Sequence, residues 1–107
     1  MSPAIDISVV VPVYGHPEQL DRLLAGLDRQ TLAADRFEVV VSDDGSLEPP
    51  QAGPRAYEVG TVRQHDEGFR AAAARNLGAG AASGDVIAFL DQDCVPAPDY
   101  LERVLAA

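Results

Sequence analysis

Two aspartates separated by one residue, Asp91 and Asp93, follow directly after a run of apolar residues. In an extended segment, side chains alternate in direction, so residues two apart lie on the same side. Hard divalent cations prefer oxygen ligands, and Mg²⁺ or Mn²⁺ commonly shares its ligands between one or two carboxylates and phosphate oxygens. The spacing therefore predicts a site for a metal-bound phosphate compound. A simple turn at the end of a strand, with one aspartate capping a helix, is the alternative interpretation.

Polar residues also stand at the ends of two other predicted strands. Tyr14 follows the first of them, and Asp43 and Asp44 follow the second. In open α/β sheets, ligands bind beyond the carboxyl ends of the strands, and these ends meet at one edge when the strands are parallel. We therefore expect these residues to lie on the same edge as the acidic pair described above.

The chemistry of these side chains fits a nucleotide. A carboxylate of Asp43 or Asp44 can accept the imide N–H of a uracil, because only an acceptor pairs with that donor, although the segment is also a typical turn. Tyr14 can stack on a base or be a half-buried aromatic residue. Arg70 is expected in the first turn of a helix, where a cation is unfavourable, which indicates that it faces an anion. Arg75, in the middle of that helix, fits a solvated face or a binding role equally well.

Four apolar runs predict the strands that position these groups, over residues 7–13, 37–42, 57–65 and 85–90. Three of the runs are continuous, which is typical of strands in a parallel sheet that are buried on both faces. The run 57–65 is weaker and is expected near a sheet edge. Pro12, which has no N–H to donate, is expected to mark the end of regular pairing in the first strand.

Three helices are expected along the chain. The first begins at Pro17 and has an apolar face of leucines at helical spacing: Leu20, Leu23, Leu24 and Leu27. The second covers 67–82, with Asp66 as its N-cap and with three small residues packed closely on the sheet: Ala71, Ala74 and Ala81. A short helix over 99–106 closes the chain.

This order of elements predicts an open, mostly parallel, Rossmann-like α/β sheet with helices against its faces. The 107 residues suffice for one small domain, and a hydrophobic content of 47% allows a packed core. We therefore treat residues 1–107 as a single domain.

Composition excludes several classes of partner. The formal net charge is −9, which argues against nucleic acid and anionic membrane surfaces. No run approaches the ~20 apolar residues of a membrane span, and no signal peptide is recognisable at the N-terminus. Cys94 is the one cysteine, which fits a reducing compartment and favours a cytoplasmic protein. An acidic protein that binds a diphosphate needs local positive charge, from a cation or from arginines.

Several motifs, in this order and spacing, resemble those of family 2 glycosyltransferases along essentially the whole chain: Val11-Pro12-Val13-Tyr14, Asp43-Asp44-Gly45-Ser46, Gly68 with Ala74-Arg75-Asn76-Leu77-Gly78, and Ser83-Gly84-Asp85 leading to Phe89-Leu90-Asp91-Gln92-Asp93. The resemblance implies the GT-A fold and an inverting, metal-dependent transfer from a nucleotide-diphosphate sugar, most often UDP-linked. The stretch from Gly68 to Asn76 is especially similar to bacterial polysaccharide-type members such as chondroitin-polymerising enzymes.

The resemblance also implies roles for individual residues in a nucleotide pocket. Pro12 and Tyr14 would line this pocket. Asp44 would contact the uracil, with Asp43 supporting it, and Arg70 would contact the nucleotide.

The two acids of the 91–93 segment would have different roles by the same resemblance. Asp93 would bind Mn²⁺ or Mg²⁺ directly, and Asp91 would bind the ribose or support the metal without touching it. The cation would neutralise the diphosphate and stabilise it as a leaving group, which would supply the positive charge that the acidic chain lacks.

Two departures from the family pattern affect the expected activity. Gly15-His16 stands where the family commonly has asparagine, so the first loop is expected to differ in shape. Family members also continue beyond this length with a portion that binds the saccharide or other hydroxyl acceptor and supplies the general base, an Asp or Glu. We therefore expect residues 1–107 to be the donor-binding half, with no catalytic base, no transfer activity alone, and an exposed apolar surface that favours self-association.

Two alternatives remain open at this stage. Asp91-Gln92-Asp93-Cys94-Val95 also matches the opening motif of haloacid-dehalogenase-like phosphatases, whose first aspartate is a nucleophile; that fold needs a lysine, and this chain has none. A nucleotide-binding or oligomerising fragment without catalysis is the second alternative. A dinucleotide-binding oxidoreductase is disfavoured, because no Gly-x-Gly-x-x-Gly follows the first strand.

Overall fold

A computed structural model describes residues 4–65 and 70–107. Its elements, in chain order, are β1 (Ile7–Val13), α1 (Pro17–Asp28), η1 (Ala34–Arg36), β2 (Phe37–Asp43), β3 (Glu58–Arg63), α2 (Ala71–Ala81), β4 (Val86–Phe89) and α3 (Tyr100–Ala106). The predicted strands and helices are therefore all present, most of them within one or two residues of the expected ends. The short 3₁₀ helix η1 was not expected from the sequence.

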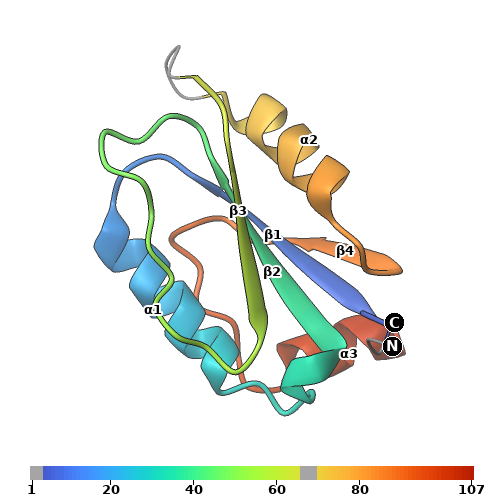
Figure 1. The fold of residues 1–107 in the computed structure, drawn as a ribbon. Helices are drawn as coiled ribbons and strands as arrows, with labels where there is room; N and C mark the ends of the chain where they lie inside the picture. Colours follow the sequence, from blue (N-terminus) through green and yellow to red (C-terminus); the bar gives the residue numbers. More distant parts are fainter. Residues whose placement is uncertain (1–3, 66–69) are drawn as a thin grey trace.

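The strands form one four-stranded sheet in the order β3-β2-β1-β4, and every neighbouring pair is parallel. Figure 1 shows α2 on one face of this sheet and α1 with α3 on the other. The predicted Rossmann-like fold class is confirmed. Among the described residues, no helix combines the length and apolarity needed to cross a membrane.

The two central strands form the core, as their continuous apolar runs predict. Every residue of β1 is buried, and β2 is buried apart from Glu38, which is half-buried. The leucine face of α1 packs on one side of these strands, and all four of its leucines are at most 1% exposed: Leu20, Leu23, Leu24 and Leu27.

The prediction that regular pairing ends at Pro12 is wrong. Pro12 lies inside β1, opposite Ser42 of β2. Backbone groups of alternate strand residues point to the same neighbour, and the Val10 carbonyl bonds toward β4, so Pro12 also faces the β4 side. The register between β1 and β4 ends at Val10 and Phe89. Pro12 therefore faces a side where the ladder has already ended and no N–H is needed.

The two outer strands are more exposed than the central ones. The expected edge position of the 57–65 run is confirmed, because β3 lies at one end of the sheet. The expectation that the 85–90 run is buried on both faces is wrong, because β4 lies at the other end. Val86, Ile87 and Phe89 remain 38%, 39% and 46% exposed.

Helix α2 begins later than the sequence predicts. Its first residue is Ala71, and Arg70 precedes it as the N-cap residue rather than lying in the first turn. The expected N-cap Asp66 and the expected role of Gly68 lie outside the described residues. Ala74 packs on the sheet as expected, whereas Ala81 is exposed and Gly78 takes the second buried position. The last close contact of α2 with the sheet is therefore at Gly78, one turn before the expected position at Ala81.

A carboxylate at the other end of the sheet fixes the turn between α2 and β4. Glu38 accepts hydrogen bonds from Ser8 Oγ at 2.5 Å and from the backbone N–H of Ser83 at 2.7 Å, and Gly84 N donates to Ser8 Oγ at 2.8 Å. Burial alone would raise the pKa of Glu38, but the hydrogen bonds from Ser8 and Ser83 outweigh it and hold the pKa below its ordinary value of 4.5.

This network predicts a pH-dependent contribution to stability. Because the folded-state pKa of Glu38 is lowered, its contribution is present above pH 4.5 and is lost as the pH falls through the folded-state pKa. Glu38→Gln should lower the free energy of unfolding by about 1 kcal/mol at pH 7 and have little effect at pH 3. Urea unfolding at both pH values measures this, with Glu48→Gln, an exposed loop substitution, as the control. An equal loss at both pH values would contradict the role of the charge.

Candidate functional site

Polar side chains from the ends of β1 and β4 meet in one cleft of about 480 Å³, at the sheet edge that the sequence predicts. The cleft is lined by residues of β1, α1 and α2 and of the loops after β1 and β4: Pro12, Tyr14, His16, Gln19, Ala71, Arg75, Asp91, Gln92 and Asp93. Four of the residues predicted for the nucleotide and metal site are among them: Pro12, Tyr14, Asp91 and Asp93.

The acidic pair after β4 is exposed and close together. Asp91, Asp93 and Cys94 each offer one ligand atom, and these atoms lie within 4.8 Å of one another. A turn with a hydrogen bond of 3.0 Å from Cys94 N to the Asp91 carbonyl holds them there. Two exposed carboxylates are hard oxygen donors that fit Mn²⁺ or Mg²⁺, with water or phosphate oxygens completing the ligand set. The donor set therefore fits the cation that the resemblance implies.

Arg75 brings a positive charge to the same cleft. Its Nη2 lies 3.3 Å from Asp91 Oδ1, although 16 residues separate the two in the chain. Both groups are well exposed, so their attraction is weak in water, and the guanidinium remains accessible to an anion in the cleft. The sequence left Arg75 undecided between a solvated face and a binding role, because no local spacing rule links it to Asp91.

Asp43 does not line this cleft and is fully buried. Its Oδ1 accepts hydrogen bonds from the Ser46 backbone N–H at 3.1 Å and from Ser46 Oγ at 2.5 Å. Its Oδ2 lies 2.9 Å from Nε of Arg63, at the end of β3. The segment thus forms the turn that its sequence suggests, and an arginine balances the buried charge.

Asp44 is also fully buried, with protein donors at both of its oxygens. Oδ1 accepts from Gln64 Nε2, and Oδ2 accepts from the backbone N–H of Arg70. The Arg70 guanidinium lies 3.7 Å from Asp44 Oδ1 and donates to the His65 carbonyl at 2.7 Å. Arg70 therefore does face an anion, as the sequence indicates, and in this structure the anion is Asp44.

The structure thus divides the residues named from the sequence into two groups. Pro12, Tyr14 and the acids after β4 line the cleft. Asp43 and Asp44 are buried, Arg70 is partly exposed, and none of the three lines the cleft. The link between the two groups is short, because Asp44 N donates to the carbonyl of Val13 at 2.8 Å.

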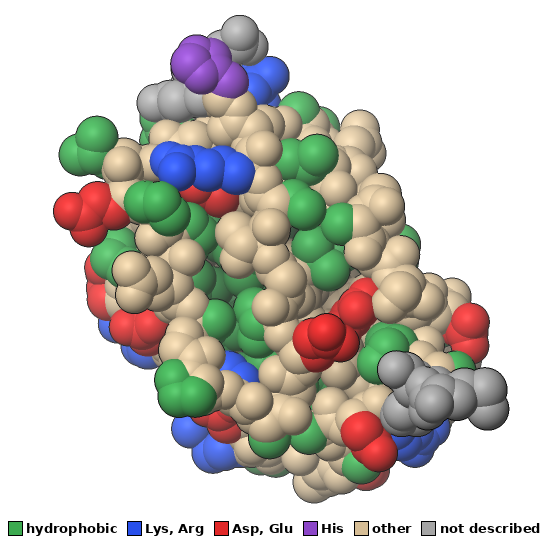
Figure 2. All heavy atoms as spheres, viewed as in Figure 1, with side chains coloured by type: hydrophobic (Ala, Val, Ile, Leu, Met, Phe, Trp, Pro, Cys, Tyr) green, Lys and Arg blue, Asp and Glu red, His purple; other side chains and the backbone are tan. Residues whose placement is uncertain are grey.

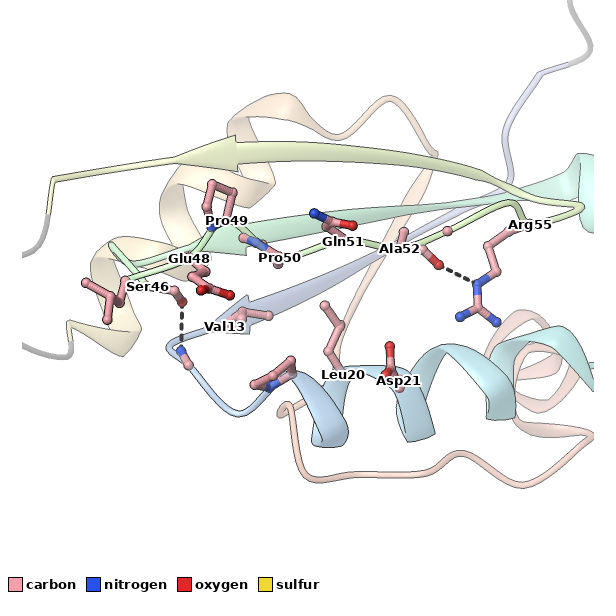
Figure 3. A pocket seen from close by; sticks show the side chains of 14 residues that line it. Val13, Leu20, Asp21, Ser46, Glu48, Pro49, Pro50, Gln51, Ala52 and Arg55 are labelled. Atoms are coloured by element: carbon pink, nitrogen blue, oxygen red, sulfur yellow. Dashed lines mark hydrogen bonds between the residues drawn. The ribbon is translucent and has the colours of Figure 1, made fainter.

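A larger cleft of about 850 Å³ lies between α1 and the loop 46–55 and contains none of the residues predicted for the site. Figure 3 shows Leu20 and Asp21 projecting from α1 toward Pro50 and Gln51 of the loop. Gly15 lines this cleft, while its neighbours Tyr14 and His16 line the smaller one. The loop 14–16 is therefore a wall shared by both clefts.

Charged side chains of both signs lie on the surface of the molecule. On the face drawn in Figure 2, acidic and basic side chains are scattered, and the basic ones form no continuous patch among the described residues. A phosphate backbone requires a basic surface, and this face does not present one.

The cleft lies at the carboxyl ends of the strands, which is where open α/β sheets bind their ligands. The profile of Glycosyl transferase family 2 matches residues 8–107, and the chain belongs to this family. The resemblance noted in the sequence is therefore confirmed.

Curated relatives of the chain are glycosyltransferases. Validoxylamine A glucosyltransferase of Streptomyces hygroscopicus subsp. jinggangensis is 48% identical over 105 residues, which cover 94% of this chain and 25% of that protein. Chondroitin synthase of Escherichia coli is 38% identical over 103 residues, which cover 92% of this chain and 15% of that protein. The chain thus spans a quarter or less of the length of these two relatives.

Solved structures share the fold. S. aureus TarS 1–349 in complex with UDP-GlcNAc matches 95% of this chain and 30% of its own, with a TM-score of 0.83 and 26% identity. The mannosyltransferase PcManGT of Pyrobaculum calidifontis, in complex with GDP-Man and Mn²⁺, matches 97% of this chain and 32% of its own, with a TM-score of 0.81 and 23% identity. The second likeness concerns the fold alone.

Proposed function

We propose that this chain is the part of a family 2 glycosyltransferase that binds the nucleotide-diphosphate sugar donor, with UDP as the nucleotide. The cleft at the carboxyl edge carries the proposal, because it combines the exposed carboxylates Asp91 and Asp93 with the guanidinium of Arg75. Family membership and the shared fold of a UDP-GlcNAc complex support the same ligand class. The exposed free thiol of Cys94 fits a reducing compartment, so we place this function in the cytoplasm.

The nucleoside is proposed to lie against Tyr14 and Pro12, with Arg75 facing the diphosphate. Asp44 and Arg70 are proposed to meet the uracil, with Asp43 fixing the turn behind them. Because Asp44 accepts from Gln64 and Arg70 in this structure, the imide N–H of the base would replace one of these donors. Exchange of one donor for another keeps the buried carboxylate satisfied.

Asp93 is proposed to hold Mn²⁺ or Mg²⁺, and Asp91 to bind the ribose or support the ion. When bound, the cation supplies charge neutralisation for the diphosphate leaving group. The chain's own residues orient the donor and exclude part of the solvent from it. Arg75, paired with Asp91 in this structure, is proposed to turn toward the phosphates when they enter.

The acceptor site and the general base are proposed to belong to the parts of the relatives that this chain does not span. In keeping with this, the outer strand β4 leaves Val86, Ile87 and Phe89 partly exposed, and further polypeptide or a second copy of the chain would cover them. Residues 1–107 alone are therefore expected to bind donor without transferring sugar. Transfer activity measured with this chain would contradict that division of labour.

Calorimetric titration with UDP, with and without Mn²⁺, tests the donor site. We expect binding with Mn²⁺ and much weaker binding without it, because the two carboxylates would otherwise repel the diphosphate. Equal binding under both conditions would contradict the metal role, and no binding under either would contradict the donor site. Turnover of p-nitrophenyl phosphate would instead favour the phosphatase alternative.

A further inference from the structure

Gln92, the residue between the two acids, is tied to the loop that follows β1. Its Oε1 accepts from the Tyr14 backbone N–H at 3.2 Å, and its Nε2 donates to the carbonyls of Gly15 at 2.5 Å and His16 at 2.9 Å. These partners are 76 to 78 residues away in the chain. One amide group thus satisfies backbone groups of three successive residues.

The loop that Gln92 holds has a backbone that requires support. Gly15 and His16 both have positive φ, 67° and 52°. For a residue with a side chain, such as His16, this conformation costs of order 1–3 kcal/mol and persists only when the surroundings hold it. The His16 carbonyl also accepts from Gln19 N at 3.0 Å, which starts α1. Gln92 therefore fixes Gly15, the strained His16 and the start of the helix.

The opposite side of this loop is held from β2. Gly15 N donates to Ser46 Oγ at 2.7 Å, and Ser46 Oγ donates to Asp43 Oδ1 at 2.5 Å. The loop is therefore fixed between the turn after β2 and the acidic segment after β4. Of the two supports, only the one from Gln92 lies in the cleft and between the acids.

We propose that Gln92 is a positioning residue, which holds the loop 14–16 so that Tyr14 faces the nucleotide while Asp91 and Asp93 face the diphosphate. This inference rests on the proposed donor site. The proposal requires the residue between Asp91 and Asp93 to donate hydrogen bonds and to accept one. An aliphatic side chain does neither, and a carboxylate accepts but does not donate.

The chain offers a close control for this role. Gln30 also makes three hydrogen bonds to distant or local backbone groups, donating to Gly26 O at 3.2 Å and Ala97 O at 2.7 Å and accepting from Leu101 N at 3.0 Å. It lies two residues after the end of α1 and outside the cleft. Gln30→Ala and Gln92→Ala therefore remove the same chemistry from the fold, but only the second removes it from the site.

We expect both alanine variants to lower the melting temperature, and only Gln92→Ala to weaken UDP binding in the presence of Mn²⁺, by about tenfold, as typical for loss of a residue that orients a site. Gln92→Glu should weaken binding as well, because it keeps the acceptor for Tyr14 N and loses the donor to the two carbonyls. Equal UDP affinities for Gln92→Ala, Gln30→Ala and the parent chain would overturn the proposal.

Amide hydrogen exchange separates this inference from the proposed function. Gln92→Ala should increase exchange at the Tyr14 amide, whose N–H bonds to Gln92, whereas Gln30→Ala should leave it protected, with or without any nucleotide. The parent chain could fail to bind UDP while the Tyr14 amide loses protection in Gln92→Ala. That result would contradict the proposed donor site and would still support the role of Gln92 in holding the loop 14–16. Unchanged protection at Tyr14 would show that Gln92 does not hold the loop.

Discussion

Asp93→Asn is expected to remove the Mn²⁺-dependent part of UDP binding, with a loss of about a hundredfold or more in affinity. Residues that only orient a metal ligand typically account for 10–100-fold, so loss of the charged ligand itself should reach at least the upper end. Asp93 is exposed and no ion pair involving it is seen among the described residues, so the stability of the fold should not change. Calorimetry with UDP and Mn²⁺ measures the affinity, and thermal unfolding checks the fold.

Two further aspartates make the result interpretable. Asp91→Asn should have the smaller effect, about tenfold, because Asp91 is proposed to support the site and because its loss also releases Arg75 from the pair at 3.3 Å. Asp85→Asn neutralises an exposed acid at the opposite end of β4 and should leave binding unchanged. If the three variants changed the UDP affinity by the same amount, the net charge of the protein would govern nucleotide affinity and a metal site would not.

The central part of the fold could be predicted because its sequence pattern admits few alternatives. The β-branched run Ile7–Val13 suits only a strand buried on both faces, and the leucines of α1 repeat at helical spacing. Parallel pairing then placed Tyr14 and Asp91 at one edge before any contact was known. Position within the sheet was harder to predict: the run that became β4 is as apolar as β1, yet it lies at an edge and is half exposed.

The candidate site was predicted from residue types, which carry no information on the burial of each side chain. Asp43 and Asp44 read as a turn with one carboxylate turned toward a ligand, whereas both are fully buried against arginines that arrive from elsewhere in the chain. Arg63 follows β3 and Arg70 precedes α2, so neither pairing has a local spacing rule such as the i,i+4 rule of helices. The same holds for Gln92, whose three partners are all more than 70 residues away.

Helix α2 packs very closely on the sheet at Gly78, and a larger residue there should destabilise the fold. A Cβ added at Gly78 would lie 2.4 Å from Val10 Cγ1 and 3.2 Å from Ser42 Cβ. Val10 is β-branched and fully buried in the central strand, so its side chain has little freedom to move away. Ser42 is held as well, because its Oγ donates to the Ala74 carbonyl at 2.6 Å. The helix must therefore move outward to admit the methyl group.

Gly78→Ala is accordingly expected to lower the free energy of unfolding by about 1–3 kcal/mol, the usual cost of overpacking a core. Gly80→Ala, two residues along the same helix, meets no atom within 4 Å and should raise the free energy of unfolding by up to about 1 kcal/mol, because alanine favours a helix more than glycine does. Urea unfolding of the two variants gives both values.

Outward movement of α2 would also carry Arg75 away from the cleft, so Gly78→Ala should weaken UDP binding while Gly80→Ala leaves it unchanged. The two glycine-to-alanine variants of α2 should therefore change the free energy of unfolding in opposite directions. Equal changes would show that α2 does not lie this close to β1.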